Sequence, residues 1–213
     1  MNVYSVILIA ISSYLIGSIS GGVIIGKIRN TDIRQKGSKA AGATNAFRTM
    51  GTIFALTVLI IDVYKGYFAV EYIPTLLNDD TDTIKALAGI MCILGHTYPL
   101  YFNFKGGKGV GTALGTLIAF PEILALIGIA FASWVVILII TGYVGLSSIL
   151  ATLSIPILYI LTKGTICDTL GIFSLIITLF IIFTHRSNIL RMISGNENRF
   201  EKAMFLKKIF NKS

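Results

Sequence analysis

Long apolar stretches separated by short polar segments dominate the sequence. A bilayer core of about 30 Å is crossed by roughly 20 helical residues, so each long stretch is a candidate transmembrane helix. Seven stretches can be delimited, at residues 3–25, 52–73, 84–101, 110–120, 123–140, 144–161 and 170–184. The pattern predicts an all-α, polytopic integral membrane protein with seven transmembrane helices, and we expect one membrane-embedded domain over residues 1–213.

The fourth stretch is short, and it could be fused with the fifth through Pro121 and Glu122. A continuous helix over residues 110–140 would be about 46 Å long at 1.5 Å per residue, which exceeds the thickness of a bilayer core. We therefore expect two separate spans here.

The basic residues predict the orientation of these spans. Of 18 Lys and Arg residues, 15 fall in segments 27–50, 101–109 and 185–213. With seven spans these segments lie on one side, which the positive-inside rule makes cytoplasmic. The N-terminus is then outside, and a basic tail over 185–213 is cytoplasmic. Because residues 1–26 contain no Lys or Arg, the first stretch is expected to be a retained span and not a signal peptide.

Composition excludes several other classes of protein. The chain is 54% hydrophobic and 13% charged, with a mean hydropathy of +0.81 and a net charge of +8. Soluble domains carry about 25% charged residues. The basic residues are not interleaved with aromatics, so no nucleic acid is expected as a partner. Anionic lipid headgroups or phosphorylated substrates fit better. Cys92 and Cys167 form no metal-ligand spacing, and no metal is expected.

Two glycine-rich, basic segments are candidates for phosphate binding. In residues 37–48, Ser38, Thr44 and Asn45 offer short hydrogen-bonding side chains, and Arg48 can contact two phosphate oxygens. In residues 104–109, three glycines surround Lys108 without forming a Walker A sequence. The alternatives are a helix N-cap with solvated basic residues for the first segment and a flexible basic turn for the second.

Three further groups of polar residues have both functional and structural interpretations. His185 and Asn188 begin the tail, where they could bind a substrate or form an interfacial cap. Ser147 follows the fifth span, where serines also mediate helix contacts. Asp62 and Lys65 lie one helical turn apart within the second span, as a proton or substrate path or as a mutually neutralising structural pair.

The order of these motifs resembles the bacterial acyl-phosphate:glycerol-3-phosphate acyltransferases of the PlsY type. The resemblance extends over nearly the whole chain. The residues that carry it are Gly17-Ser18, Gly37-Ser38, Gly42-Ala43-Thr44-Asn45, Arg48, Asp62, Lys65-Gly66, Gly95-His96, Pro99, Phe104 to Gly109, His185-Arg186, Asn188-Ile189, Arg191, Gly195 and Glu197. Ser20, Lys39-Ala40 and Gly145 stand where the family usually has proline, Gly-Asn and serine.

The resemblance implies transfer of a fatty acyl group from acyl phosphate to the 1-hydroxyl of sn-glycerol 3-phosphate, without a cofactor. The products would be lysophosphatidic acid and phosphate, in the first step of phospholipid synthesis at the cytoplasmic face of the bacterial plasma membrane. Lys108, His185 and Asn188 would be catalytic. The substrate-binding residues would be Ser38, Ala43, Thr44, Asn45, Arg48, Gly106, Gly107 and Gly109, with Ser147 as a candidate replacement for the family's serine.

Two other functions remain open from the residues. One is a membrane transporter of a phosphorylated solute, against which stands the absence of internal repeats. The other is a catalytically weak divergent homologue. For the enzyme, no Ser-His-Asp set is apparent, so we expect the glycerol hydroxyl to attack acyl phosphate directly. Its proton would pass to His185 or to the phosphate of the bound glycerol 3-phosphate.

Overall fold

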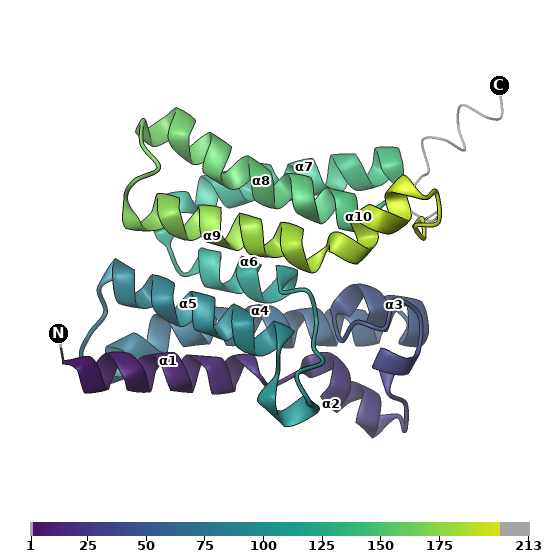
Figure 1. Cartoon of the computed structure of the whole chain (residues 1–213), viewed down its shortest axis with the longest axis horizontal. Helices are drawn as coiled ribbons and strands as arrows, with labels where there is room; N and C mark the ends of the chain where they lie inside the picture. Colours follow the sequence, from purple (N-terminus) through teal and green to yellow (C-terminus); the bar gives the residue numbers. More distant parts are fainter. Residues whose placement is uncertain (1, 201–213) are drawn as a thin grey trace. The chain divides into compact units, whose positions relative to one another are not determined.

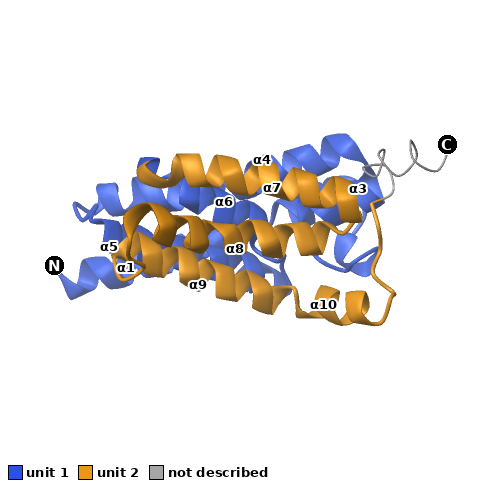
Figure 2. Cartoon of the chain, turned by 90° about the horizontal axis from the view of Figure 1, so that it is seen from above, with its two compact units in different colours: residues 1–121 blue, residues 122–213 orange. Residues whose placement is uncertain are grey.

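The computed structural model of the chain describes residues 2–200 (Figure 1). Within that range every regular element is a helix, which confirms the all-α prediction. The chain divides into two compact units, Met1–Pro121 and Glu122–Ser213 (Figure 2). We call them unit 1 and unit 2, and each is described by itself.

Unit 1 is organised around its longest helix, α4. The elements of the unit are α1 (Val3–Gly17), α2 (Gly21–Ile28), the 3-10 turn η1 (Ile33–Gln35), α3 (Ala43–Met50), α4 (Thr52–Leu76), α5 (Asp82–Thr97), the 3-10 turn η2 (Leu100–Phe102) and α6 (Val110–Ile118). Helix α4 contacts α1, α5 and α6, and α1 packs along α5. Buried Ile9 of α1 meets Ile84 and Ala88 of α5 in one apolar cluster.

The crossing of α4 and α6 depends on small residues. A Cβ atom at Gly66 would overlap the carbonyl oxygen of Thr112, and one at Gly115 would overlap that of Val63. Because neither glycine has a side chain, the two backbones approach closely, as small residues allow between membrane helices. The short helix α6 is thereby held against α4, and the loop that precedes it is positioned.

Up to residue 200, unit 2 consists of three long helices and one short one. They are α7 (Leu124–Thr141), α8 (Val144–Lys163), α9 (Thr169–Thr184) and α10 (Arg186–Ile193), and the 3-10 turn η3 (Pro121–Ile123) precedes α7. Helix α8 packs against both α7 and α9. Asp168 caps α9 by accepting from the Gly171 amide at 2.8 Å, and it also accepts from the Tyr159 hydroxyl at 2.7 Å. The Tyr159 hydrogen bond lowers the pKa of Asp168.

The structure confirms most of the expected elements and corrects two boundaries. The separation at Pro121 is confirmed, because α6 ends at Ile118 and α7 begins at Leu124. The first stretch is not one helix: α1 ends at Gly17 and α2 begins at Gly21. The third stretch does not remain helical to residue 101, since α5 ends at Thr97, two residues before Pro99, whose ring disfavours helical backbone in the residue before it.

Four helical segments of residues 2–200 are long and apolar enough to cross a membrane. They are Val3–Ile28, Thr52–Leu76, Pro121–Thr141 and Val144–Lys163. A fifth is added if α9 and α10, which are bent by 53° at their junction, are taken as one span. Helices α5 and α6, with 16 and 9 residues, are shorter than the roughly 20 residues that cross a bilayer core. The chain is a multi-pass membrane protein.

Candidate functional site

The loop between α2 and α3 is organised by one buried side chain, Asn45. Its carboxamide nitrogen donates to the carbonyl oxygens of Ile33, Lys36 and Ala40 at 2.7, 3.1 and 2.9 Å. Its oxygen accepts from the Ser38 amide at 2.8 Å. Asn45 therefore shapes the loop that presents Ser38, and its predicted role in substrate binding stays a prediction.

The same loop is anchored to α4 by apolar contacts. Ile33 and Ala46 are buried with Val58 of α4, and Ala43 packs against this cluster. Thr44 is exposed on the first turn of α3. The loop is therefore fixed on its apolar side, and its polar side remains accessible.

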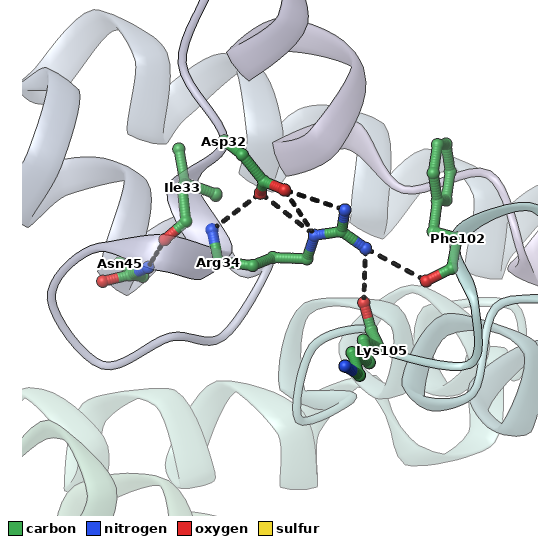
Figure 3. Close-up of polar contacts among 6 residues, drawn as sticks. All are labelled: Asp32, Ile33, Arg34, Asn45, Phe102 and Lys105. Carbon is green, nitrogen blue, oxygen red and sulfur yellow. Dashed lines mark hydrogen bonds and ion pairs between the residues drawn. The ribbon is translucent and has the colours of Figure 1, made fainter.

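An arginine clamp connects this loop with the loop between α5 and α6 (Figure 3). Arg34 donates from one terminal nitrogen to the carbonyl oxygen of Phe102 at 3.0 Å and that of Lys105 at 3.4 Å. Asp32 orients the guanidinium by accepting from its Nε at 3.0 Å and from its other terminal nitrogen at 2.9 Å. The Arg34 hydrogen bond holds the pKa of Asp32 below its ordinary value. The carboxylate is therefore charged at neutral pH, and the clamp is intact there.

A direct backbone contact joins the same two loops. The Ala41 amide donates to the carbonyl oxygen of Gly106 at 3.2 Å. Together with the Arg34 clamp, this contact brings residues 37–48 and 104–109 to one side of unit 1. Asp32 and Arg34 were not among the residues predicted for the site. Their spacing as Asp-x-Arg, directly before the glycine-rich segment, is the signal that could have drawn attention to them.

Two backbone amides of the second loop, residues 104–109, form hydrogen bonds within the protein. The amides of Gly106 and Gly107 donate to the carbonyl oxygens of Thr97 and His96, both at 3.2 Å. Protein carbonyls accept from these two amides, and phosphate binding by Gly106 and Gly107 stays a prediction. Other donors of this segment are the side chain of half-buried Lys108 and the first-turn amides of α6, which have no preceding helical turn to donate to.

Within α4, Asp62 and Lys65 form a buried ion pair. The Lys65 ammonium lies 2.9 Å from the Asp62 carboxylate, and their side chains are 5% and 4% exposed. His96 of α5 joins them, with its Nδ1 2.9 Å from the Lys65 nitrogen. Asp62 and Lys65 therefore do form a pair, and His96 lies beside it. The position of His96 could not be inferred from the spacing of residues along α4.

In unit 2, the junction of α9 and α10 presents His185 and Asn188. His185 is 4% exposed, and its Nδ1 lies 2.8 Å from the carbonyl oxygen of Ile181. A carbonyl can only accept, so Nδ1 carries the proton and neutral His185 has its acceptor at Nε2. A nitrogen in this state can take a proton from a substrate.

A carboxylate fixes the side chain of Asn188. Glu197 accepts from Asn188 Nδ2 at 2.8 Å and from Arg191 Nε at 2.7 Å. A Cβ atom at Gly145 would lie 3.0 Å from the Asn188 carboxamide, so the start of α8 also touches it. Ser147 is fully buried and donates to the Tyr143 carbonyl at 3.0 Å, which favours a role inside α8 over contact with a substrate.

The predicted site residues therefore form two groups. Unit 1 holds Ser38 on the loop before α3, Ala43, Thr44, Asn45 and Arg48 in α3, and Gly106, Gly107, Lys108 and Gly109 on the loop before α6. Unit 2 holds His185, Asn188 and Ser147. Nowhere in residues 2–200 do three or more His, Cys, Asp or Glu side chains gather in a way that could hold a metal ion.

Comparison with known proteins assigns the chain to a family. The sequence model for the glycerol-3-phosphate acyltransferases matches residues 7–195. The glycerol-3-phosphate acyltransferase of Prochlorococcus marinus (strain MIT 9215) is 40% identical, over 91% of this chain and 96% of its own. The protein of that name from Halalkalibacterium halodurans is 40% identical, over 90% of this chain and 94% of its own.

Solved structures give the same result. The crystal structure of PlsY, an integral membrane glycerol 3-phosphate acyltransferase, matches in its glycerol 3-phosphate form with a TM-score of 0.83 and 34% identity, over 92% of this chain and 96% of that one. Its lysophosphatidic acid form matches with a TM-score of 0.82 and 32% identity, over 94% of this chain and 99% of that one. This chain belongs to the glycerol-3-phosphate acyltransferase family.

Proposed function

We propose that this chain transfers a fatty acyl group from acyl phosphate to the 1-hydroxyl of sn-glycerol 3-phosphate, releasing lysophosphatidic acid and inorganic phosphate. The observation that carries this proposal is the match, over more than nine tenths of the chain, to an acyltransferase in glycerol 3-phosphate and lysophosphatidic acid forms. The reaction is the first step of phospholipid synthesis, and the protein needs no cofactor for it.

The proposed chemistry is direct acyl transfer between the two substrates. The 1-hydroxyl oxygen bonds to the carbonyl carbon of acyl phosphate, and the bond from that carbon to the phosphate oxygen breaks. Negative charge gathers on the departing phosphate, where the Lys108 ammonium and the first-turn amides of α6 stabilise it. The Arg34 clamp and the Ala41–Gly106 hydrogen bond support this assignment, because they join the loop of Lys108 to that of Ser38, Thr44 and Arg48.

The hydroxyl proton has two candidate acceptors, His185 Nε2 and the phosphate of the bound glycerol 3-phosphate. The Ile181 carbonyl at His185 Nδ1 supports the first, because it leaves Nε2 as the basic nitrogen. Asn188, which Glu197 holds in place, is proposed to bind glycerol 3-phosphate. If His185 is the base, His185→Gln removes most of kcat, whereas a rise confined to KM assigns His185 to binding and the proton to the substrate phosphate.

We also propose seven membrane spans, with the N-terminus outside and the C-terminus in the cytoplasm of a bacterial cell. The whole chain then serves as one catalytic domain, with both candidate loops of unit 1 and the start of α10 on the cytoplasmic side. The concentration of 15 of the 18 basic residues in the segments expected on that side supports this orientation.

The native cysteines test this orientation. Cys167 is exposed in the segment between α8 and α9, which the proposal places outside, while Cys92 is buried and provides an internal control. A membrane-impermeant maleimide should label Cys167 in intact cells, and Cys167→Ser should abolish the labelling. Labelling that requires permeabilised membranes would contradict the proposed topology.

The proposed activity is tested with the purified full-length protein in detergent. Palmitoyl phosphate and glycerol 3-phosphate should give 1-acylglycerol 3-phosphate, detected by mass spectrometry, and palmitoyl-CoA should not replace palmitoyl phosphate. Proteoliposomes that move labelled glycerol 3-phosphate without acylating it would instead indicate a transporter. Protein that binds palmitoyl phosphate without turnover would indicate a catalytically weak homologue.

A further inference from the structure

Three acceptors surround the buried ammonium of Lys65. The Asp62 carboxylate lies 2.9 Å away, the carbonyl oxygen of Ile19 lies 2.7 Å away, and His96 Nδ1 lies 2.9 Å away. An ammonium has three N–H donors and no acceptor, so all three partners are groups that it attracts. Lys65 thereby ties the break between α1 and α2 to α4 and α5.

This arrangement assigns the protonation of His96. His96 Nδ1 lies closer to the Lys65 nitrogen, at 2.9 Å, than to the Asp62 carboxylate, at 3.4 Å. Because the ammonium can only donate, Nδ1 accepts from it, and the proton of the neutral ring lies on Nε2. The ring is 3% exposed, so its orientation is fixed by packing as well as by this hydrogen bond. Lys65 therefore determines both the tautomer and the direction of the far edge of the ring.

The far edge of the His96 ring lies against the loop that carries Lys108. A Cβ atom at Gly107 would overlap His96 Nε2 and lie 2.8 Å from Cε1 and 3.2 Å from Cδ2. The main chain of His96 contacts the same residue, because its carbonyl oxygen accepts from the Gly107 amide at 3.2 Å. His96 thus supports Gly107, the residue directly before Lys108, with its ring and with its backbone.

We propose that His96 is a positioning residue for Lys108. The Asp62–Lys65 pair holds the His96 ring, and the ring holds Gly107 so that the Lys108 ammonium is presented at a fixed place. A buried ion pair adds little net stability on average, so a positional role also accounts for placing two charges inside the spans. This proposal rests on the proposed function, since it concerns the positioning of a group that acts on phosphate.

The first test compares His96→Asn in the native chain and in the Lys108→Ala background. The Asn oxygen can still accept from Lys65, but the shorter side chain leaves Gly107 unsupported. We expect kcat/KM for palmitoyl phosphate to fall about 10- to 100-fold in the native chain, since small misplacements of catalytic groups have effects of this size. In Lys108→Ala the same change should cost less than about threefold, because the two residues act as one unit.

A second variant changes Gly107 on the loop and leaves Lys65 and His96 unchanged. Gly107 does not have the left-handed backbone that would itself exclude alanine, so the His96 ring is the main obstacle to a methyl group there. Gly107→Ala should reduce kcat/KM at least tenfold with an unchanged elution profile in size-exclusion chromatography. The loss should again disappear in the Lys108→Ala background.

The matched control breaks the ion pair between Glu71 of α4 and Lys85 of α5. Glu71→Gln removes the partner that lies 3.5 Å from Lys85 and should change kcat/KM by less than about twofold. If His96→Asn or Gly107→Ala folds and stays within twofold of the native chain, or if either loss is equally large without Lys108, the positioning proposal is overturned. Absence of turnover by the native chain would instead count against the proposed function.

Discussion

Two ionic arrangements support the loops of unit 1, and they differ most in their exposure to water. The Asp62–Lys65 pair lies inside the helices with both side chains about 5% exposed or less, and His96 completes it. The Asp32–Arg34 clamp lies between two loops with side chains 30% and 22% exposed. Both arrangements contact the segment that leads to Lys108. His96 of the first contacts Gly107, and Arg34 of the second donates to the carbonyl oxygens of Phe102 and Lys105.

The difference teaches how the same kind of interaction can serve two purposes. Removing one partner of a buried pair leaves a charge that neither water nor another group neutralises, so the loss of either partner alone strongly destabilises the fold. The Asp32–Arg34 pair is partly exposed, so solvent screens its charges and the pair contributes little to stability. Its value lies in geometry, because the planar guanidinium of Arg34 bonds two carbonyl oxygens of the neighbouring loop while Asp32 holds its other edge.

The largest effect is expected from Lys65→Met, which leaves Asp62 charged and buried. The variant should lose about 3–5 kcal/mol of stability, measured by SDS-induced unfolding in mixed micelles. The double variant Asp62→Leu/Lys65→Met removes both charges and should recover a substantial part of that loss. A single variant within about 1 kcal/mol of the native chain would show that the pair is not desolvated as described.

Next in size is the effect of Arg34→Gln on activity. The variant loses the two Arg34 hydrogen bonds to the neighbouring loop, so kcat/KM should fall about tenfold or more while the unfolding free energy changes by no more than about 1–2 kcal/mol. Arg34→Lys keeps the charge but not the planar pair of donors, so it should resemble the Gln variant. Full activity in Arg34→Lys would mean that charge alone is required at this position.

A smaller effect is expected in unit 2 from Glu197→Gln. The carboxylate holds Asn188 and Arg191 at 2.8 and 2.7 Å, and the neutral amide retains only one acceptor oxygen for them. We expect KM for glycerol 3-phosphate to rise several-fold, because Asn188 loses its orientation. A normal KM, measured by phosphate release at saturating palmitoyl phosphate, would separate Asn188 from substrate binding.

The smallest effect concerns the pH dependence of the clamp. The folded pKa of Asp32 is lowered by Arg34, so the carboxylate stabilises the fold fully above the unfolded value of about 3.9 and loses this contribution as the pH falls through the lowered pKa. The native chain and Asp32→Asn should therefore show parallel stabilities between pH 8 and 5. Below about pH 4 the native chain should lose stability more steeply than the variant. Divergence between pH 8 and 5 would contradict the assignment.

The sequence predicted the elements of this fold well because a membrane helix is encoded by a continuous apolar run. The break at Pro121 followed from the same physics, since one helix over both runs would be too long for a bilayer. The break between α1 and α2 was missed because Ser18, Ile19 and Ser20 barely interrupt the apolar pattern. The Ile19 carbonyl there is bound by Lys65, which is 46 residues away in sequence.

Sequence reasoning found the residues of the candidate site more readily than their roles. Glycine and basic residues indicated phosphate binding on the loops of Ser38 and Lys108, and the structure joins those loops. It could not be seen from the sequence that Asn45 shapes its own loop or that the Gly106 and Gly107 amides bond to residues of α5. Such assignments depend on contacts between segments distant in sequence, and spacing along one segment does not contain them.

The central claim is that Lys108 promotes direct acyl transfer from acyl phosphate to glycerol 3-phosphate. It is tested most directly by measuring phosphate release from palmitoyl phosphate with and without glycerol 3-phosphate, for the native chain and for Lys108→Ala. The account predicts release that depends on glycerol 3-phosphate, no burst in its absence, and a loss of about 100-fold or more in Lys108→Ala. A stoichiometric burst without glycerol 3-phosphate, or a Lys108→Ala variant with native turnover, would contradict it.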